Sequence, residues 1–300
     1  MVIEHTELRI TALDIARPGA LEQIRSYFRD DRDIGAYALA YMNPLRINRG
    51  DFYQKFLNSS TYYFCSSGER AGLVVLTKAS NPLLQVFGDP TLIKSALKRI
   101  PVAKARYLAT ASPHHEEVLS QSYRLDNILR MSRMGLAPEN FIEGTYKFND
   151  IELVRLHGKQ IHEINNLYRE SDGPYVYSAN AIDHGVYWGV RNRDQLVAIS
   201  GTHVVSTVER IGIVGNVFTK HGFRSRGFAQ MATSAVTRSL IDMGCHDVVL
   251  SVDPNNGPAV NAYKKLGFNL KSSIIESRLR SRPKFKVAQT LNRLGLNRWI

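Results

Sequence analysis

The sequence is poor in cysteine, in tryptophan and in long hydrophobic runs. Only Cys65 and Cys245 occur among 300 residues, each in a strand-like run, which predicts buried free thiols and excludes a disulfide framework or a cysteine metal site. No stretch approaches the roughly 18 consecutive apolar residues of a membrane-spanning helix, and Glu4 and Glu7 stand where a signal peptide would be basic and then apolar. We therefore expect a cytoplasmic, globular protein.

Acidic residues are missing from residues 277–300, which hold seven Lys and Arg. The formal net charge of the chain is +12, but residues 1–150 contribute only +3 and residues 151–276 only +2, so most of the excess lies in this tail. Val287, Leu291 and Leu294 would share one helical face in the tail. That face could dock on the protein, which is the simplest interpretation, or lie on an anionic membrane or contact nucleic acid.

The first half of the chain is typical of a mixed α/β lobe. Two β-rich runs, 59–66 and 71–78, are joined by a turn at Gly68 and Glu69. The helical pattern that begins at Pro90 has a strand on either side of it, and a helix follows over 114–123. Residues 134–150 lose this periodicity and gather Pro, Gly, Asn and Asp, which indicates a linker. We place the domains at 1–145 and 146–276, followed by the basic tail at 277–300.

The second half has a clearer order of elements. A strand and a helix come first, and the runs 186–192, 196–206 and 210–219 then read as antiparallel strands joined by short polar turns. A long amphipathic helix over 226–243 is followed by a buried strand, a short helix and a last strand. The fold class that we predict is α/β (α+β), with a mixed, mostly antiparallel sheet flanked by helices.

A turn rich in Gly and Arg lies between the strand ending near Thr219 and the long helix. The first turn of a helix offers unpaired backbone N–H groups and the positive end of the helix dipole. Gly227 allows close backbone approach, and Arg224 and Arg226 add positive charge. This combination suits a pyrophosphate. The sequence has neither GxGxxG nor GxxxxGK[ST] here, so nicotinamide cofactors and ATP have no motif support.

The short helix after the buried strand carries two further candidates. Asn256 precedes Tyr263 by seven residues, close to two helical turns, so both can act at one site. Asn256 is also a good helix N-cap before Gly257 and Pro258, and Tyr263 shares its helical stripe with apolar residues that indicate a core position. Both interpretations stay open.

These two motifs in this order resemble the GNAT superfamily of coenzyme A-dependent N-acyltransferases. The R-x-x-G-x-A turn is Arg224, Gly227 and Ala229, and the second motif runs from Asn256 to Phe268. The resemblance covers about residues 152–275. It implies that acetyl-CoA is the cosubstrate and an amine the acceptor. By resemblance, the residues that contact acetyl-CoA are Val217, Phe218, Thr219, Arg224, Ser225, Arg226, Gly227, Phe228, Ala229 and Asn256.

The resemblance also implies that Tyr263 protonates the departing thiolate of coenzyme A, in a direct transfer without a covalent enzyme intermediate. The general base is open: some relatives carry a glutamate five residues before the asparagine, but this position is Ser251 here. His203 or water could remove the proton of the amine, and His203 could equally be a structural residue of the sheet. The pairs His114 with His115 and His157 with His162 lack carboxylate or cysteine partners, so we predict no metal site.

The first lobe resembles the degenerate amino-terminal halves of some two-part GNAT proteins, and we expect it to close the acceptor side of the site. Two other functions stay possible. One is a coenzyme A-binding regulatory module without turnover, and the other is association with nucleic acid or a membrane through the tail. The oligomeric state and the identity of the amine are not encoded in any motif.

Overall fold

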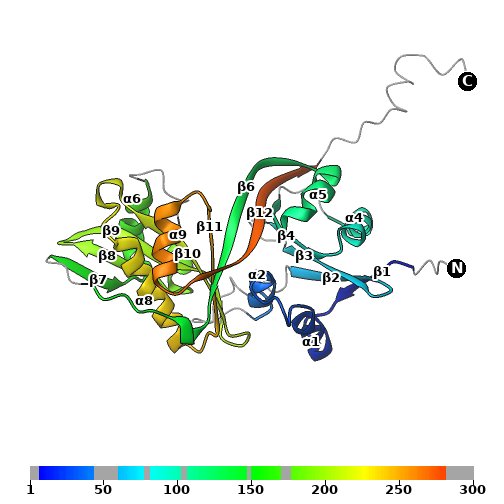
Figure 1. Ribbon diagram of the computed structural model, residues 1–300, viewed down its shortest axis with the longest axis horizontal. Helices are drawn as coiled ribbons and strands as arrows, with labels where there is room; N and C mark the ends of the chain where they lie inside the picture. The colour runs from blue at the N-terminus through cyan, green and yellow to red at the C-terminus, as the bar shows by residue number, and fades with distance from the viewer. Residues whose placement is uncertain are drawn as a thin grey trace, which may run out of the picture.

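Among the described residues, a single sheet of twelve strands runs through both halves of the chain. The computed structural model describes residues 7–43, 60–77, 82–102, 107–146, 150–169 and 177–281, and for Ser281 only the backbone. Two lobes lie side by side, joined by two long strands that pass between them (Figure 1). The strand order is β1-β2-β3-β4-β5-β12-β6-β11-β10-β9-β8-β7.

The first half of the chain forms one lobe with helices on the sheet. Its elements are β1 (Arg9–Leu13), α1 (Pro18–Tyr27), α2 (Ala36–Ala40), β2 (Ser60–Ser67), β3 (Arg70–Thr77), β4 (Leu83–Gly88), α4 (Pro90–Arg99), β5 (Tyr107–Ala111), α5 (Glu116–Ser122) and β6 (Tyr123–Leu136). The runs rich in Val, Leu and Tyr become β2 and β3, and Pro90 begins α4 where its missing N–H costs nothing.

The second half repeats this order of strands and helices. Its elements are β7 (Ile151–Arg155), α6 (Ile161–Arg169), α7 (Ala179–Asp183), β8 (Trp188–Asn192), β9 (Gln195–Ser206), β10 (Ile211–Thr219), α8 (Phe228–Asp242), β11 (Asp247–Val252), α9 (Gly257–Lys265) and β12 (Asn269–Ser281). Among the described elements, each half therefore reads strand, two helices, three strands, helix, strand, helix, strand.

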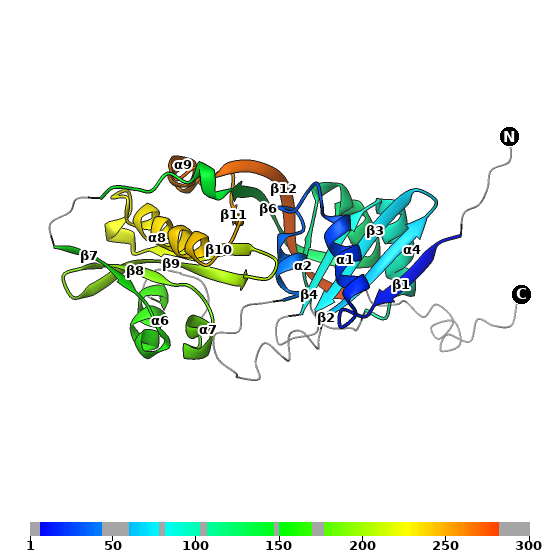
Figure 2. The same cartoon turned by 90° about the horizontal axis from the view of Figure 1, so that it is seen from below.

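The strand pairing is repeated as well. In the first half β1 to β4 pair antiparallel and β4 pairs with β5 in parallel; in the second half β7 to β10 pair antiparallel and β10 pairs with β11 in parallel. The last strand of each half then pairs with the other half, β12 with β5 and β6 with β11, and β6 and β12 pair with each other. The halves are interlocked by this exchange, as Figure 2 shows from below.

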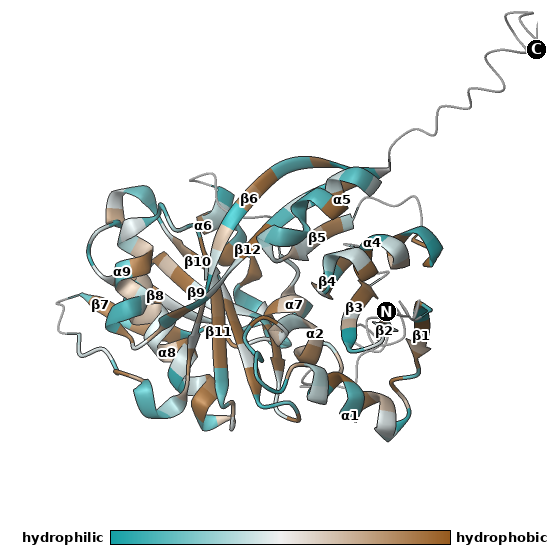
Figure 3. Cartoon of the chain, turned by 45° about the vertical axis from the view of Figure 1, so that its right-hand side comes forward, coloured by the Kyte–Doolittle hydropathy of each residue, from teal (hydrophilic) through white to brown (hydrophobic). Residues whose placement is uncertain are grey.

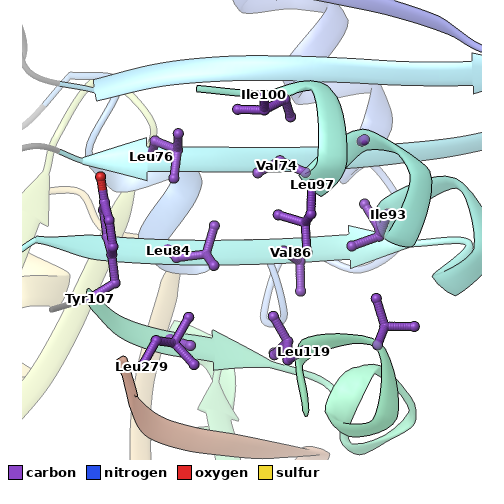
Figure 4. Close-up of a cluster of buried hydrophobic side chains, with 14 of the residues drawn as sticks. Val74, Leu76, Leu84, Val86, Ile93, Leu97, Ile100, Tyr107, Leu119 and Leu279 are labelled. Atoms are coloured by element: carbon purple, nitrogen blue, oxygen red, sulfur yellow. The ribbon is translucent and has the colours of Figure 1, made fainter. Parts of the chain in front are cut away.

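The hydrophobic core is divided in the same way. In the first lobe, Val74, Leu76, Leu84 and Val86 of the sheet pack against helices α4 and α5, and Leu279 of β12 joins them (Figure 4). In the second lobe, a corresponding cluster lies under α8 and α9. A third cluster joins the lobes, because residues of α1 and α2 pack on β2 and β3 and also on β9, β10 and β11. In Figure 3 the crossing strand β6 alternates between hydrophilic and hydrophobic segments.

The predicted fold class is confirmed, and two boundaries differ from expectation. Met134, Gly135 and Leu136 belong to the end of β6, where they pair with β11, rather than to a linker. Ser277–Ser281 continue β12, with Ser277 to Leu279 paired to β5 and Arg278 to Ser281 paired to β6. Sequence reasoning missed both because the partners of these strands lie in the other half of the chain. The rest of the predicted tail, residues 282–300, lies outside the described residues.

Candidate functional site

The site predicted from the two motifs surrounds the place where β10 and β11 separate. The two strands pair in parallel only from Ile211–Ile213 to Asp247–Val249, although β10 continues to Thr219 and β11 to Val252. We call residues 214–219 and 250–252, which flank this separation, the splay. In the first lobe β4 stays paired with β5 up to Ala111, the end of β5, so that lobe has no corresponding separation.

A bulge in β10, in its pairing with β9, lies within the splay. Gly215 pairs with Gly201 and Phe218 with Ile199, so β10 carries one extra residue there, and Asn216 has a left-handed φ of 55°. Three tyrosines hold Asn216. The Tyr168 hydroxyl donates to its carbonyl oxygen at 2.7 Å and the Tyr177 hydroxyl to its Oδ1 at 2.5 Å, while its Nδ2 donates to the Tyr187 hydroxyl at 2.8 Å.

The Gly- and Arg-rich turn connects the end of β10 to α8. Gly227 is the N-cap of α8 with φ 81°, and no side chain caps the helix. Ser225 is also left-handed, with φ 62°. The Arg224 side chain folds back, so that its Nε donates to the carbonyl oxygen of Thr219 at 3.1 Å. The beginning of α8 therefore presents the positive end of a 15-residue helix beside two arginines, which is a suitable place for a pyrophosphate.

The corresponding turn of the first lobe is closed by its own residues. Asp89 is the N-cap of α4, and its Oδ1 accepts a hydrogen bond from the backbone N–H of Leu92 at 2.9 Å. Pro90 removes another N–H from the same helical turn. A carboxylate thus lies where an anionic ligand would bind, and it would repel the ligand. The sequence feature behind this difference is Asp89-Pro90 in place of the longer turn 220–227.

The structure places both candidates of the second motif on α9. The Asn256 side chain accepts from the backbone N–H of Ala259 at 3.2 Å, which confirms its role as N-cap. Tyr263 is 7% exposed and belongs to the buried cluster that includes Val214, Leu250 and Val252 of the splay. Burial raises the pKa of Tyr263 to about 12, so the phenol stays protonated at neutral pH. No hydrogen bond joins its hydroxyl to another described residue.

His203 lies on the opposite face of the sheet from Tyr263. It is the extra residue of a bulge in β9, because Ile213 pairs with Val204 and Val214 with Thr202. The bulge directs His203 toward α2, where its Nδ1 makes a short hydrogen bond with the Tyr37 hydroxyl. His203 is exposed, but desolvation by the surrounding protein atoms lowers its pKa to about 4. Sequence reasoning did not find Tyr37, which comes from the first lobe and lies in no motif.

Two further findings concern the described residues alone. No group of three or more His, Cys, Asp or Glu side chains gathers there as a set of metal ligands, and none of the described helices is long and apolar enough to cross a membrane.

Cys65 and Cys245 are buried free thiols, as predicted, and burial raises the pKa of both, to about 11 and about 12.

Comparison with known proteins agrees with the predicted fold class. Residues 158–268 match the Acetyltransferase (GNAT) family. Over 62 residues the chain is 40% identical to a mycothiol acetyltransferase of Corynebacterium jeikeium (strain K411). That match covers 21% of this chain and only 18% of the relative.

Solved structures match over nearly the whole chain. A Drosophila protein has a TM-score of 0.68 at 12% identity and covers 90% of this chain and 98% of its own. A tandem GNAT protein from the clavulanic acid biosynthesis pathway has a TM-score of 0.54 at 12% identity and covers 93% and 100%. The likeness to the GNAT family covers residues 158–268, and the two-lobe fold of the chain is like that of the tandem protein.

Proposed function

We propose that the protein is an N-acyltransferase that transfers an acetyl group from acetyl-CoA to a primary amine, and that only the second lobe carries the catalytic site. The proposal rests on one difference between the two lobes. In the second lobe β10 and β11 separate beside an uncapped helix start with two arginines, whereas in the first lobe the strands stay paired and Asp89 caps the helix. Val217 to Thr219 would contact the pantetheine arm, and residues 224–229 the pyrophosphate.

The two faces of the splay would have different roles in the reaction. Tyr263 belongs to the cluster under α8 and α9, and it would protonate the thiolate that leaves from acetyl-CoA. His203 and Tyr37 lie on the α2 face, where the amine would approach. Proton donation contributes on the order of 10²- to 10⁴-fold to a rate. Holding both reactants at the splay contributes on the order of 7 to 11 kcal/mol.

Water is the better candidate for the base. The pKa of His203, at about 4, makes it a weak acceptor for the proton of an ammonium group, and its Nδ1 is already bonded to Tyr37. Ser251 stands where some relatives have a glutamate, and its Oγ accepts a hydrogen bond from Arg133. These observations also support a rival function, a coenzyme A-binding module without turnover. Measurements on Tyr263→Phe distinguish this module from an enzyme.

The first test is stabilisation by acetyl-CoA. A ligand at 100 times its dissociation constant adds about 2.7 kcal/mol to the free energy of unfolding. We expect this stabilisation for the wild type, and we expect the double variant Arg224→Ala/Arg226→Ala to bind about 10- to 100-fold more weakly, because it loses charge-assisted contacts. Thermal unfolding with and without acetyl-CoA measures both.

A matched control is available in the first lobe. Lys98→Ala/Arg99→Ala removes the same charge from exposed positions of α4, the helix that corresponds to α8, and should leave acetyl-CoA binding unchanged. If acetyl-CoA does not stabilise the wild type, or if both double variants lose affinity equally, the assignment of the cofactor site is wrong.

A further inference from the structure

A fully buried arginine lies on the α2 face of the sheet, next to the splay. Arg133 of β6 is 1% exposed, and it pairs with Ser251 of β11 on one side and Ser272 of β12 on the other. Residues that pair directly across antiparallel strands project to the same face, so these three side chains gather there. Tyr37 of α2 covers them, with its ring centre 5.1 Å from the Arg133 guanidinium carbon.

The partners of Arg133 are neutral. Its Nη1 donates to Ser251 Oγ at 2.9 Å, and within the described ranges no carboxylate oxygen lies within the 4.0 Å of an ion pair. Its Nε is buried without a hydrogen-bond partner, and so is the Oγ of Ser272, which faces it across the strand pair. A buried cation that lacks a counterion is costly, and unpaired buried polar atoms are rare in folded proteins.

Glu276 is an acidic residue on this face of the sheet. It pairs with Leu129, four residues along β6 from Arg133, and it forms no ion pair with the arginine. Burial raises the pKa of Glu276, and the charge of Arg133 acts against that shift. Glu276 therefore offsets part of the positive charge from a distance but leaves the hydrogen-bonding capacity of the Arg133 Nε unused.

The position of this group connects it to the proposed reaction. Ser251 lies on β11 within the splay, and across the splay His203 lies against Gly215 of β10, so close that a Cβ at Gly215 would clash with its ring. His203 is exposed, so a ligand that reaches Arg133 would pass beside His203 and Tyr37, which cover the arginine from the α2 side. The charge of Arg133 also contributes to the lowered pKa of His203.

We propose that Arg133 binds a carboxylate group of the acceptor, so that the substrate is an amine that also carries a carboxylate, as an amino acid does. The inference rests on the proposed function, whose cosubstrate would enter from the other face of the splay. Nε of Arg133 and the hydroxyl of Ser272, both buried without a partner, would be the two donors to the carboxylate. A carboxylate fits better than a phosphate, because a single arginine with Glu276 on the same face does not balance a dianion.

The test uses matched pairs of probes. The first pair is an N-acetylated amino acid and its carboxamide, titrated calorimetrically into the protein saturated with coenzyme A. The second pair is the corresponding free amino acid and amino acid amide, assayed for thiol release from acetyl-CoA. We expect carboxylates to bind about 10- to 100-fold more tightly than amides, the range for hydrogen bonds to a charged group. Arg133→Met should abolish this preference and leave acetyl-CoA affinity unchanged.

Three further variants keep the test decisive if Arg133→Met folds poorly. Arg133→Lys keeps the charge but loses Nε, and Ser272→Ala loses the facing hydroxyl; each should weaken carboxylate binding and leave amide binding unchanged. Arg130→Met on the same strand is the control, because Arg130 is exposed and pairs with Glu116 at 2.9 Å. It should retain the full preference.

Several results would overturn the proposal. These are equal binding of carboxylates and amides, no binding by any carboxylate probe, or a carboxylate preference that survives Arg133→Met. Loss of stability in ligand-free Arg133→Met that is restored by adding Glu276→Gln would also overturn it, because it would make Arg133 part of a structural charge pair. Failure of the wild type to bind acetyl-CoA is a separate result, which rejects the proposed function itself.

Discussion

Tyr263 is the residue on which the choice between an enzyme and a binding module depends. Its phenol is buried at 7% exposure among the apolar side chains of α8, α9 and the splay, and this burial raises its pKa to about 12. A phenol that remains protonated from acid to about pH 11 can donate a proton to a thiolate throughout the range in which amines are acetylated.

We expect Tyr263→Phe to lower kcat by about 10²- to 10⁴-fold, the usual contribution of a proton donor, and to leave the dissociation constant of acetyl-CoA within about twofold. The ring is kept, so the core should not lose packing. Thiol release with saturating amine, together with acetyl-CoA titration, measures both quantities. A variant with full activity would show that Tyr263 is only a core aromatic residue, and no activity in the wild type with any amine would favour the binding module.

Sequence reasoning reached the residues of the proposed site that lie in local motifs and missed those that come together across the fold. The turn 224–229 and the helix start at Asn256 follow local rules of helix capping and dipole direction, which short segments encode. Tyr37 and Arg133 reach the site only because α2 and β6 of the first half lie against the second. The orientation of His203 depends on a bulge, and strict alternation along β9 would not predict it.

Among the elements, β10 shows most clearly how the site is shaped. Its bulge at Asn216 forces a left-handed backbone at a non-glycine residue, and the three tyrosine hydroxyls hold that conformation from α6, from the segment before α7 and from the residue before β8. The bulge lies between the part of β10 that pairs with β11 and Val217, so it affects the direction in which the strand runs where it pairs with β9 alone.

Asn216 therefore offers a pair of variants that separate backbone strain from tethering. Asn216→Ala should cost about 1 to 2 kcal/mol from the left-handed φ in addition to the lost hydrogen bonds. Asn216→Gly should relieve the backbone strain but should not restore the hydrogen bonds to Tyr177 and Tyr187. Urea unfolding and turnover measure the two effects. If Gly and Ala were equally stable, the left-handed conformation would not be a source of strain.

At the scale of the whole molecule, the two halves share one sheet and have a single proposed site. Division of the chain near residue 145 would remove β6 from its place between β11 and β12, and the first lobe would lose β12 in the same way. The first lobe has the same order of described elements as the second, but its own helix start at Asp89 is closed. Its contribution to the site is the face formed by α2, which carries Tyr37.

The lobes are also held together by a polar contact at the turn between β9 and β10. The side chain of Glu209 is 2% exposed, and its carboxylate accepts from Arg25 Nε at 2.9 Å and Nη2 at 2.6 Å and from Asn43 Nδ2 at 2.8 Å. Arg32 donates to the Glu209 carbonyl oxygen and to Asp247 of β11, both at 2.7 Å. The hydrogen bond from Arg25 to Glu209 is the main reason that the pKa of Arg25 is raised.

We expect Glu209→Ala to lower the free energy of unfolding by about 2 to 3 kcal/mol. This is below the range for removing one partner of a fully buried ion pair, because the Arg25 side chain is 33% exposed and can be solvated. Since β6 and β12 interlock the lobes, the variant should still unfold in a single transition in urea, monitored by tryptophan fluorescence and circular dichroism. Glu143→Ala, which breaks the exposed pair between the segment after β6 and Arg238 of α8, is the matched control and should cost less than about 1 kcal/mol. Two separate transitions in the Glu209 variant would mean that this contact, rather than the strand exchange, makes the lobes one folding unit.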